Sequence, residues 1–299
     1  MTAYLPDSVL KVLALEYGTW DDTLFHIPQI TPAPLIAQVE PFANKSKKKY
    51  PWTFNFGFSS NTGGNALSDM NYLSVIDYAN GGAVAKLHTW NEYMDYMTRN
   101  SALMDSVERK KMKLIAWNNM TDGDSGEGLG EKATHHRPLT FSLSLNKQLS
   151  PHWIFGTGIT YTHLKSKFES DFHGATLNKV QKIDYIGIPL RLTYRIWSKG
   201  RFNAYTTSGV TFEMPIRSSL SKQYIITADS SYTLKGTIRP RYQWSVNMGV
   251  GVQYRLFKPF SIYVEPNMFY YFRNGSGLET YRTEHPFTLT MPFGLRLTW

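Results

Sequence analysis

The sequence predicts an all-β fold, an eight-stranded antiparallel up-and-down transmembrane β-barrel with long loops on one rim. Three observations predict it: eight segments alternate apolar and polar residues, the connections alternate between short and long, and the polar positions hold mostly Gly, Ser, Thr and Asn. Successive side chains of a strand point to opposite faces. Each segment has about the 9–11 residues that cross a bilayer at a tilt.

The first strand is expected in residues 51–60, PWTFNFGFSS, where aromatic residues occupy every second position from Trp52 to Phe58. The clearest alternation is in residues 244–256, WSVNMGVGVQYRL, and the weakest is in 202–213. In 185–195, Pro189 predicts a bulge, because proline donates no ladder hydrogen bond. The remaining strands are expected at 139–146, 153–162, 261–271 and 287–299.

The connections predict which rim carries the loops. Residues 150–152, 196–201 and 257–260 are short enough for tight turns. Residues 60–137, 163–183, 214–242 and 272–286 are long. Short turns on one rim and long loops on the other are typical of outer-membrane barrels.

The apolar face is expected to contact lipid. Eight strands leave a lumen just wide enough for side chains, which small polar residues suit. A soluble, lipocalin-like ligand carrier with its apolar face inward is the alternative, but rings of Phe, Trp and Leu would overfill so narrow a lumen. Tryptophans also fall where an interfacial girdle is expected. Four are at the short-turn rim and one lies toward the other rim: Trp52, Trp153, Trp197 and Trp299, and Trp244.

The polar faces carry a few charged residues, which predict an ion-pair network inside the barrel. Glu265 is on the polar face of the seventh strand, and a buried carboxylate requires a partner. Arg255 and Arg296 are on the polar faces of the two neighbouring strands, and Arg191 is on that of the fourth. We expect these four residues to form the network.

Composition excludes several classes of site. The chain of 299 residues has no cysteine, so a disulfide framework or thiolate metal site is excluded. Its net charge is +9, but the motifs of nucleic-acid-binding modules are absent, and we expect no nucleic acid as partner. Residues 1–50 are interpreted as a linker or periplasmic appendage with a short helix at 7–17. The basic run 45–49, KSKKK, is a solvated linker or a contact with anionic lipid headgroups. The first 15 residues do not match a secretory signal, so export would require a start further upstream.

Four strings, HWIFGTGITYTHLKS, IDYIGIPLRLTYRIW, SVNMGVGVQYRL and IYVEPNMFYYFRNGSGLET, resemble the outer-membrane β-barrel domain family of Bacteroidetes, which includes PorT-like proteins. The resemblance covers roughly residues 51–299. It implies localisation in the outer membrane of a Gram-negative cell, with both termini periplasmic, and it implies no catalytic residues. PorT-like members are tied to protein secretion, so the resemblance also implies a role as a secretion accessory. The chain differs in its very long first loop.

Catalysis is the main alternative function. Some small outer-membrane barrels are lipid A acylases or acyltransferases that use His, Ser and Asp near the loop rim. The corresponding residues here are His135, His136, His163 and His173, with Ser166, Ser170 and Asp171. A general base needs a positioned partner, and no motif fixes one. We therefore expect no enzyme and no cofactor. Adjacent histidines on a strand point apart, so we expect no metal site at His135 and His136 either.

The long first loop is the segment most expected to carry function. Within it, Leu87, Trp90, Met94 and Met97 have helical spacing, which predicts a helix that packs on the barrel mouth or offers a surface to a protein or glycan. The acidic, Gly-rich stretch 121–131 does not have the spacing of a calcium loop and is interpreted as a loop tip.

The C-terminal strand is expected to direct assembly. Its outward residues alternate up to a terminal aromatic, in the order Phe293, Leu295, Leu297 and Trp299. The family resemblance implies that the barrel assembly machinery reads such a strand. The expected partners are therefore this machinery, outer-membrane lipid and lipopolysaccharide, and a protein or glycan at the loops.

Overall fold

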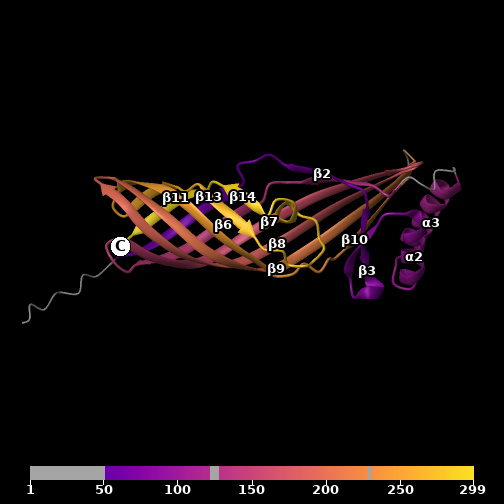
Figure 1. Cartoon of the computed structure of the whole chain (residues 1–299), viewed down its shortest axis with the longest axis horizontal. Coiled ribbons are helices and arrows are strands. Elements are labelled where there is room, and N and C mark those ends of the chain that lie inside the picture. The colour runs from indigo at the N-terminus through magenta and orange to yellow at the C-terminus, as the bar shows by residue number, and fades with distance from the viewer. Residues whose placement is uncertain (1–50, 122–127, 228–229) are drawn as a thin grey trace, which may run out of the picture. The chain divides into compact units, whose positions relative to one another are not determined.

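The computed structural model describes residues 51–121, 128–227 and 230–299. The chain divides into two units, residues 1–49 and 50–299, and everything below concerns the second (Figure 1). The expected appendage, its helix at 7–17 and the basic run 45–49 lie outside the described residues. So does most of the acidic stretch 121–131.

Eight antiparallel strands close on themselves, which confirms the predicted fold. The first six in order around the barrel are β1 (Trp52–Ser60), β6 (Leu139–Gln148), β7 (Trp153–Phe172), β8 (Ala175–Lys199), β9 (Phe202–Thr227) and β11 (Gln243–Phe257). Two broken strands follow. The last of them pairs with β1, from Thr53 opposite Thr298 to Phe58 opposite Phe293. This seam leaves the barrel without an open edge.

Prolines break the last two barrel strands. The seventh consists of β12 (Phe260–Val264) and β13 (Asn267–Tyr271), and the eighth of β14 (Phe287–Thr290) and β15 (Phe293–Thr298). The breaks fall at Pro266 and Pro292, which have no N–H to donate. Their carbonyls still accept, from Val250 N at 3.1 Å and from Glu265 N at 2.9 Å, so each pair of segments follows one strand path.

Pro189 does not produce the expected bulge. It lies within β8, and the pairing of β7 with β8 passes from Thr157–Leu190 directly to Thr160–Gly187 in unchanged register. The missing donor therefore leaves a gap in one ladder, whereas the register of β8 with β9 shifts elsewhere, near Tyr185 and Trp197.

The aromatic face of the barrel points outward. Trp52 and Phe56 of β1 are 42% and 47% exposed, while Asn55, on the opposite face, is buried at 7%. The same division holds for the other strands, whose buried polar residues include Ser144, Thr160, Thr207, Asn247 and Ser261. A polar, filled lumen inside an apolar surface is the arrangement of a membrane barrel and the reverse of a soluble one. Among the described helices, none is long and apolar enough to cross a membrane.

Two of the expected loops are strand extensions instead. Residues 163–183 continue β7 and β8 and meet in a tight turn at Gly174, whose φ is +78°. Residues from 214 onward continue β9, and β10 (Ser230–Gly236) pairs back onto it. These are the longest strands of the sheet (Figure 1).

The first loop completes this extension. β5 (Glu131–His135) pairs with β7, and β2 (Ala66–Met70) pairs with β5. The order outside the barrel is therefore β2-β5-β7-β8-β9-β10. A separate hairpin follows β2, formed by β3 (Leu73–Asp77), the 3-10 helix η1 (Tyr78–Asn80) and β4 (Ala83–Leu87). We use the name platform for this extended sheet together with the hairpin and the two helices that follow it, α2 (Trp90–Asn100) and α3 (Ser106–Thr121).

The predicted helix is present but packs elsewhere than expected. α2 (Trp90–Asn100) begins after Thr89, whose side chain accepts from Glu92 N. Its buried Trp90, Tyr93, Tyr96 and Met97 join a core with residues of α3 (Ser106–Thr121) and with Leu177 and Tyr224. Those last two belong to the extended parts of β8 and β9. The helices therefore cover the end of the extension and not the barrel mouth (Figure 1).

Candidate functional site

Glu265 is buried in the lumen and is held by three groups. The Tyr205 hydroxyl donates to Oε2 at 3.0 Å, and Asn267 Nδ2 donates to Oε1 at 3.2 Å. Arg191 Nη1 lies 3.6 Å from Oε1. Only 3% of the residue is exposed. A buried carboxylate with these partners is tolerated, and without them it would be costly.

The predicted network is only partly assembled. Arg296 contacts Glu265 through Tyr205, because its Nη2 lies 3.4 Å from the Tyr205 hydroxyl. Its guanidinium lies 5.0 Å from the ring centroids of both Tyr205 and Tyr263, within the range of cation–π attraction. Arg255 is not part of the network and is exposed near the short-turn rim.

The strand register explains this correction. Arg255 and Arg296 both lie opposite Ser261, which is four residues before Glu265. At about 3.3 Å per residue, that offset is roughly 13 Å along the strand. Arg191 comes from β8, three strands around the barrel, and its side chain reaches Glu265 across the lumen.

A second buried ion pair closes the lumen on the loop side, and sequence reasoning missed it. Arg282 makes two hydrogen bonds to Glu213, from Nη1 at 2.5 Å and Nη2 at 3.1 Å. Arg282 belongs to α4 (Tyr281–Glu284), which a capping box at Thr280 begins. Its guanidinium also lies 4.4 Å from the Tyr271 ring centroid. Glu213 continues the inward alternation of β9, which is the signal that could have revealed it.

The lumen between these pairs has little free space. A cavity of about 40 Å³ lies beside Arg191, Glu213 and Arg282, enough for about one water molecule. An eight-stranded barrel filled in this way does not form a diffusion channel.

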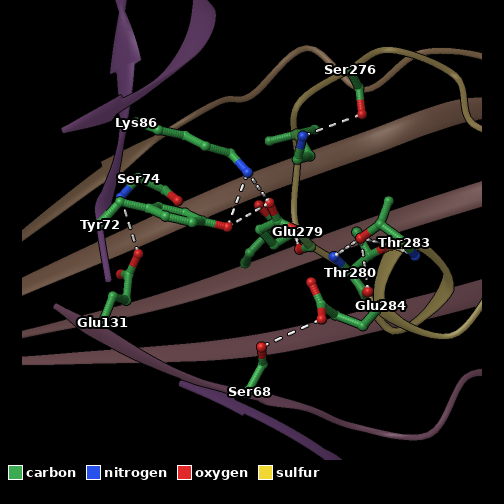
Figure 2. A network of polar contacts seen from close by, with 12 residues as sticks. Ser68, Tyr72, Ser74, Lys86, Glu131, Ser276, Glu279, Thr280, Thr283 and Glu284 are labelled. Carbon is green, nitrogen blue, oxygen red and sulfur yellow. Dashed lines mark hydrogen bonds and ion pairs between the residues drawn. The ribbon is translucent and has the colours of Figure 1, made fainter. Parts of the chain in front are cut away.

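Polar contacts join the first loop to the last loop (Figure 2). Lys86 Nζ donates to Glu279 Oε1 at 2.8 Å and to the Tyr72 hydroxyl at 2.9 Å. The Tyr72 hydroxyl donates to the same carboxylate at 3.0 Å. Burial raises the pKa of Glu279, but the hydrogen bonds from Lys86 and the neighbouring Glu284 outweigh burial and leave it lowered. Burial and Glu279 raise the pKa of Glu284, whose Oε2 accepts from Ser68 at 3.3 Å.

Two buried ion pairs fasten the first loop to the extended strands. Lys179 Nζ of β8 lies 2.5 Å from Glu131 Oε1, and Lys222 Nζ of β9 lies 2.9 Å from Glu108 Oε1. The Tyr224 hydroxyl also donates to Glu108 at 2.8 Å. Burial lowers the pKa of Lys179 despite the nearby Glu131 carboxylate. The platform is therefore a packed body and not a set of separate loops.

Two residues of the catalytic alternative, His135 and Ser166, lie together but are shielded from solvent. His135 Nδ1 and Ser166 Oγ are 2.8 Å apart, but His135 is fully buried and Ser166 is 2% exposed. Burial lowers the pKa of His135 to about 4. His163 Nδ1 contacts Asp184 Oδ1 at 2.6 Å.

The other candidates differ in exposure, since Ser170 is buried whereas Asp171 and His173 are exposed. Ser170 is 1% exposed, and Asp171 accepts from Thr176 Oγ1 at 3.1 Å. His136 donates its backbone N–H to Lys165 O, and the backbone N–H of His173 donates to Asn119 Oδ1 in the turn. The described residues contain no cluster that could hold a metal ion.

The five girdle tryptophans are exposed on the barrel surface. Trp153 packs on Tyr194 with ring centroids 5.0 Å apart, and Trp244 packs on Phe212 at 4.6 Å. Trp52 and Trp299 exchange both backbone hydrogen bonds, at 3.0 and 3.1 Å, where the seam ends. The proposed assembly residues Phe293 and Leu295 are exposed along the same strand. Their contact with headgroups and with the assembly machinery stays a prediction.

A closed barrel with a lipid-facing surface and a filled polar lumen defines an integral outer-membrane β-barrel protein. Residues 124–275 match the family model described as outer membrane protein beta-barrel domain, and the chain belongs to this family. No curated protein matches the chain.

Several solved structures are similar over most of their length. The attachment invasion locus protein Ail of Yersinia pestis is 10% identical, with 84% of this chain and 99% of that chain covered and a TM-score of 0.32. OprG of Pseudomonas aeruginosa is 11% identical, with 84% and 96% covered and a TM-score of 0.36. The outer membrane protease OmpT of Escherichia coli is 13% identical, with 84% and 98% covered and a TM-score of 0.31. Likeness at this level carries no function to this chain.

Proposed function

We propose that this outer-membrane barrel is a non-enzymatic interaction protein that holds the platform outside the cell for a partner protein or glycan. The observation that carries the proposal is the way the platform is built. Its helices and strands share a core, and the pairs Lys179–Glu131 and Lys222–Glu108 fasten them to the barrel strands. A rigid scaffold positions a recognition surface at a low cost in conformational entropy.

Helix α3 offers such a surface. Val107, Leu114 and Trp117 are exposed by 41%, 47% and 66%, and Lys110 and Lys113 are exposed beside them. Aromatic residues are enriched at recognition surfaces, and Trp117 supplies one on this helix. In this proposal the short turns and both termini are periplasmic, as is usual for bacterial barrels, and the outward face of the barrel contacts lipid and lipopolysaccharide.

Single-cysteine variants test the orientation, because the chain has no cysteine of its own. In intact cells, a membrane-impermeant maleimide should label Lys113→Cys on α3 and should not label Ser150→Cys at a short turn. Both should react after the cells are opened. Labelling of Ser150→Cys alone in intact cells would place the platform in the periplasm and reject the proposal.

A photocrosslinker at Leu114 tests the interaction role. It should yield a defined adduct on intact cells, and the same crosslinker at Leu67, which is 80% exposed on β2, should not. The finer proposal is that the partner belongs to a protein secretion system, as for PorT-like proteins of Bacteroidetes, and it rests on the resemblance of the barrel strings. Deleting the gene should then reduce the set of secreted proteins. An unchanged secretome would remove the secretion role and leave the interaction role in place.

A further inference from the structure

The barrel contains a second cavity, at its short-turn end, which the proposed function does not use. Its volume is about 340 Å³, within the range of small-ligand pockets. Hydroxyl and amide side chains form much of its wall, including Thr53, Asn146, Gln148 and Asn203. These side chains can form hydrogen bonds with a polar ligand inside the cavity.

The lining of this cavity carries four positive charges. Arg195, Arg255, Lys258 and Arg296 all line it, and the described lining residues include no Asp or Glu. Like charges gathered in a partly enclosed site disfavour one another, and an opposite charge between them would relieve that cost.

The arginine contacts show that the charge is not neutralised within the described protein. Arg296 donates to neutral acceptors, Asn55 Oδ1 at 3.0 Å and Gln253 Oε1 at 2.7 Å. Arg195 also donates to neutral acceptors, Pro151 O at 3.2 Å and Gln148 Oε1 at 3.5 Å. These bonds orient the guanidinium groups but leave their charge in place.

The opposite end of the lumen is different. There Arg282 meets Glu213, and further inside Arg191 meets Glu265. The fold therefore pairs its lumen cations with carboxylates except at the short-turn end, where an external anion can take that role.

We propose that this cavity binds a multivalent phosphate-bearing anion from solution. Three of its four cations are arginines, whose planar forks match phosphate oxygens with paired hydrogen bonds. The cavity opens inside the barrel wall, away from the outward apolar face, so a soluble phosphate compound suits it better than a membrane lipid. This site is independent of the platform and of the partner proposed for it.

Calorimetric titration of the full chain in nonionic detergent tests the proposal, with inorganic tripolyphosphate as the probe in low-salt buffer. The double variant Arg255→Gln/Lys258→Gln should weaken binding about tenfold or more, because charge-assisted contacts are the strong ones. Both residues are exposed, so the barrel should still fold, and retained heat-modifiable gel mobility checks that. Arg255→Lys/Lys258→Arg should restore binding.

Matched controls decide between a site and general charge attraction. Arg217→Gln/Lys235→Gln removes two exposed cations of the extended strands, outside the cavity lining, and should leave the affinity unchanged. An equal loss in both double variants, or no saturable binding by the unmodified protein, would overturn the proposal. Citrate binding as tight as tripolyphosphate would reject the phosphate class. Binding seen only in nanodiscs that contain anionic phospholipid would show that the phosphate belongs to a lipid headgroup, and would reject a soluble phosphate compound as the ligand.

Discussion

Glu265 shows what the sequence determines about a single residue of the lumen and what it does not. The alternation of the seventh strand predicts that Glu265 faces inward, and the structure places it there. The partner is harder to predict, because a pair across the lumen depends on strand register and tilt. The neighbouring strands predict Arg255 and Arg296 as partners, yet both lie opposite Ser261, and the ion pair forms with Arg191.

Removing the Glu265 carboxylate should destabilise the barrel. Glu265→Ala leaves Arg191 and the Tyr205 hydroxyl without their acceptor, and breaking a buried pair typically costs about 3–5 kcal/mol. Denaturant unfolding in detergent, followed by tryptophan fluorescence, measures the change. Glu265→Gln keeps acceptor and donor atoms in place and should cost less. A Glu265→Ala variant that unfolds at the unmodified denaturant concentration would contradict the role of this pair.

His135 should make the platform sensitive to acid. Its pKa falls from 6.5 to about 4 because of burial, so the folded state keeps it neutral while the unfolded segment takes up a proton below pH 6.5. Stability should therefore decrease as pH falls from 6.5 toward 4, by up to about 3 kcal/mol at 1.36 kcal/mol per pKa unit. Hydrogen exchange of β5 amides at a series of pH values, corrected for intrinsic rates, measures this.

The control for this pH dependence is His135→Gln, which removes the titrating group. Its β5 amides should be less protected overall, and their protection should vary less between pH 6.5 and 4 than in the unmodified chain. The same pH dependence in both proteins would assign it to another group, such as His136, whose pKa burial also lowers.

At the scale of elements, the barrel strands were predictable and the extended strands were not. Lipid imposes a strict apolar–polar alternation, which is visible in all eight crossing segments. Beyond the membrane that constraint ends: the buried face of the extension includes Ser166, Lys179, Gln181 and Lys222 beside Leu177. Polar residues that are buried because they form ion pairs or hydrogen bonds cannot be told from loop residues by their pattern in the sequence. Helix α2 was found because its apolar spacing is unaffected by such pairs.

Glu108 should control the attachment of α3. Glu108→Ala leaves Lys222 buried without its carboxylate, which typically costs about 3–5 kcal/mol. Hydrogen exchange should increase in α3 and in the outer part of β9. The barrel itself should remain folded and keep its heat-modifiable gel mobility. Asp95→Asn, at an exposed position of α2, should change neither. Unchanged exchange in Glu108→Ala would show that the apolar core alone holds the helix.

Residues 61–136 should be dispensable for the barrel itself. The barrel ladder runs from β1 directly to β6 and does not include this segment, and loop length changes closure entropy only slowly. A chain with this segment replaced by a short linker should still insert and show heat-modifiable mobility. Protease sensitivity of the extended strands should rise, because Lys179 and Lys222 lose their partners. A chain that never folds in detergent would instead make the platform part of the folding core.

At the scale of the whole molecule, closure is the property that the sequence predicts best. Eight strands of alternating pattern, with short and long connections in turn, leave an up-and-down barrel as the arrangement that pairs every edge. The structure closes it through β1 and β15. The Arg282–Glu213 pair was predictable only in part. The alternation of β9 places Glu213 inward, but Arg282 comes from the short helix α4, which lies outside the strand pattern.

Trp299 should matter for assembly in cells more than for stability. It ends the closing strand, exchanges backbone hydrogen bonds with Trp52 and is 63% exposed. An aromatic at this rim anchors in the interface, and the family resemblance implies that the assembly machinery reads the terminal strand. Trp299→Ala retains the backbone bonds of the seam and removes only the indole. It should sharply reduce insertion in cells and leave refolding into detergent nearly intact.

Trp153→Ala separates an assembly signal from a girdle residue. Trp153 is exposed on the barrel surface and belongs to the same expected short-turn rim, but it does not lie on the terminal strand. Surface-exposed protein in cells and the rate of refolding in detergent should be measured for both variants. Equal insertion defects would make Trp299 one girdle member among five. Failure of Trp299→Ala in both assays would make it a stability residue, because a signal read by the machinery has no role when the machinery is absent.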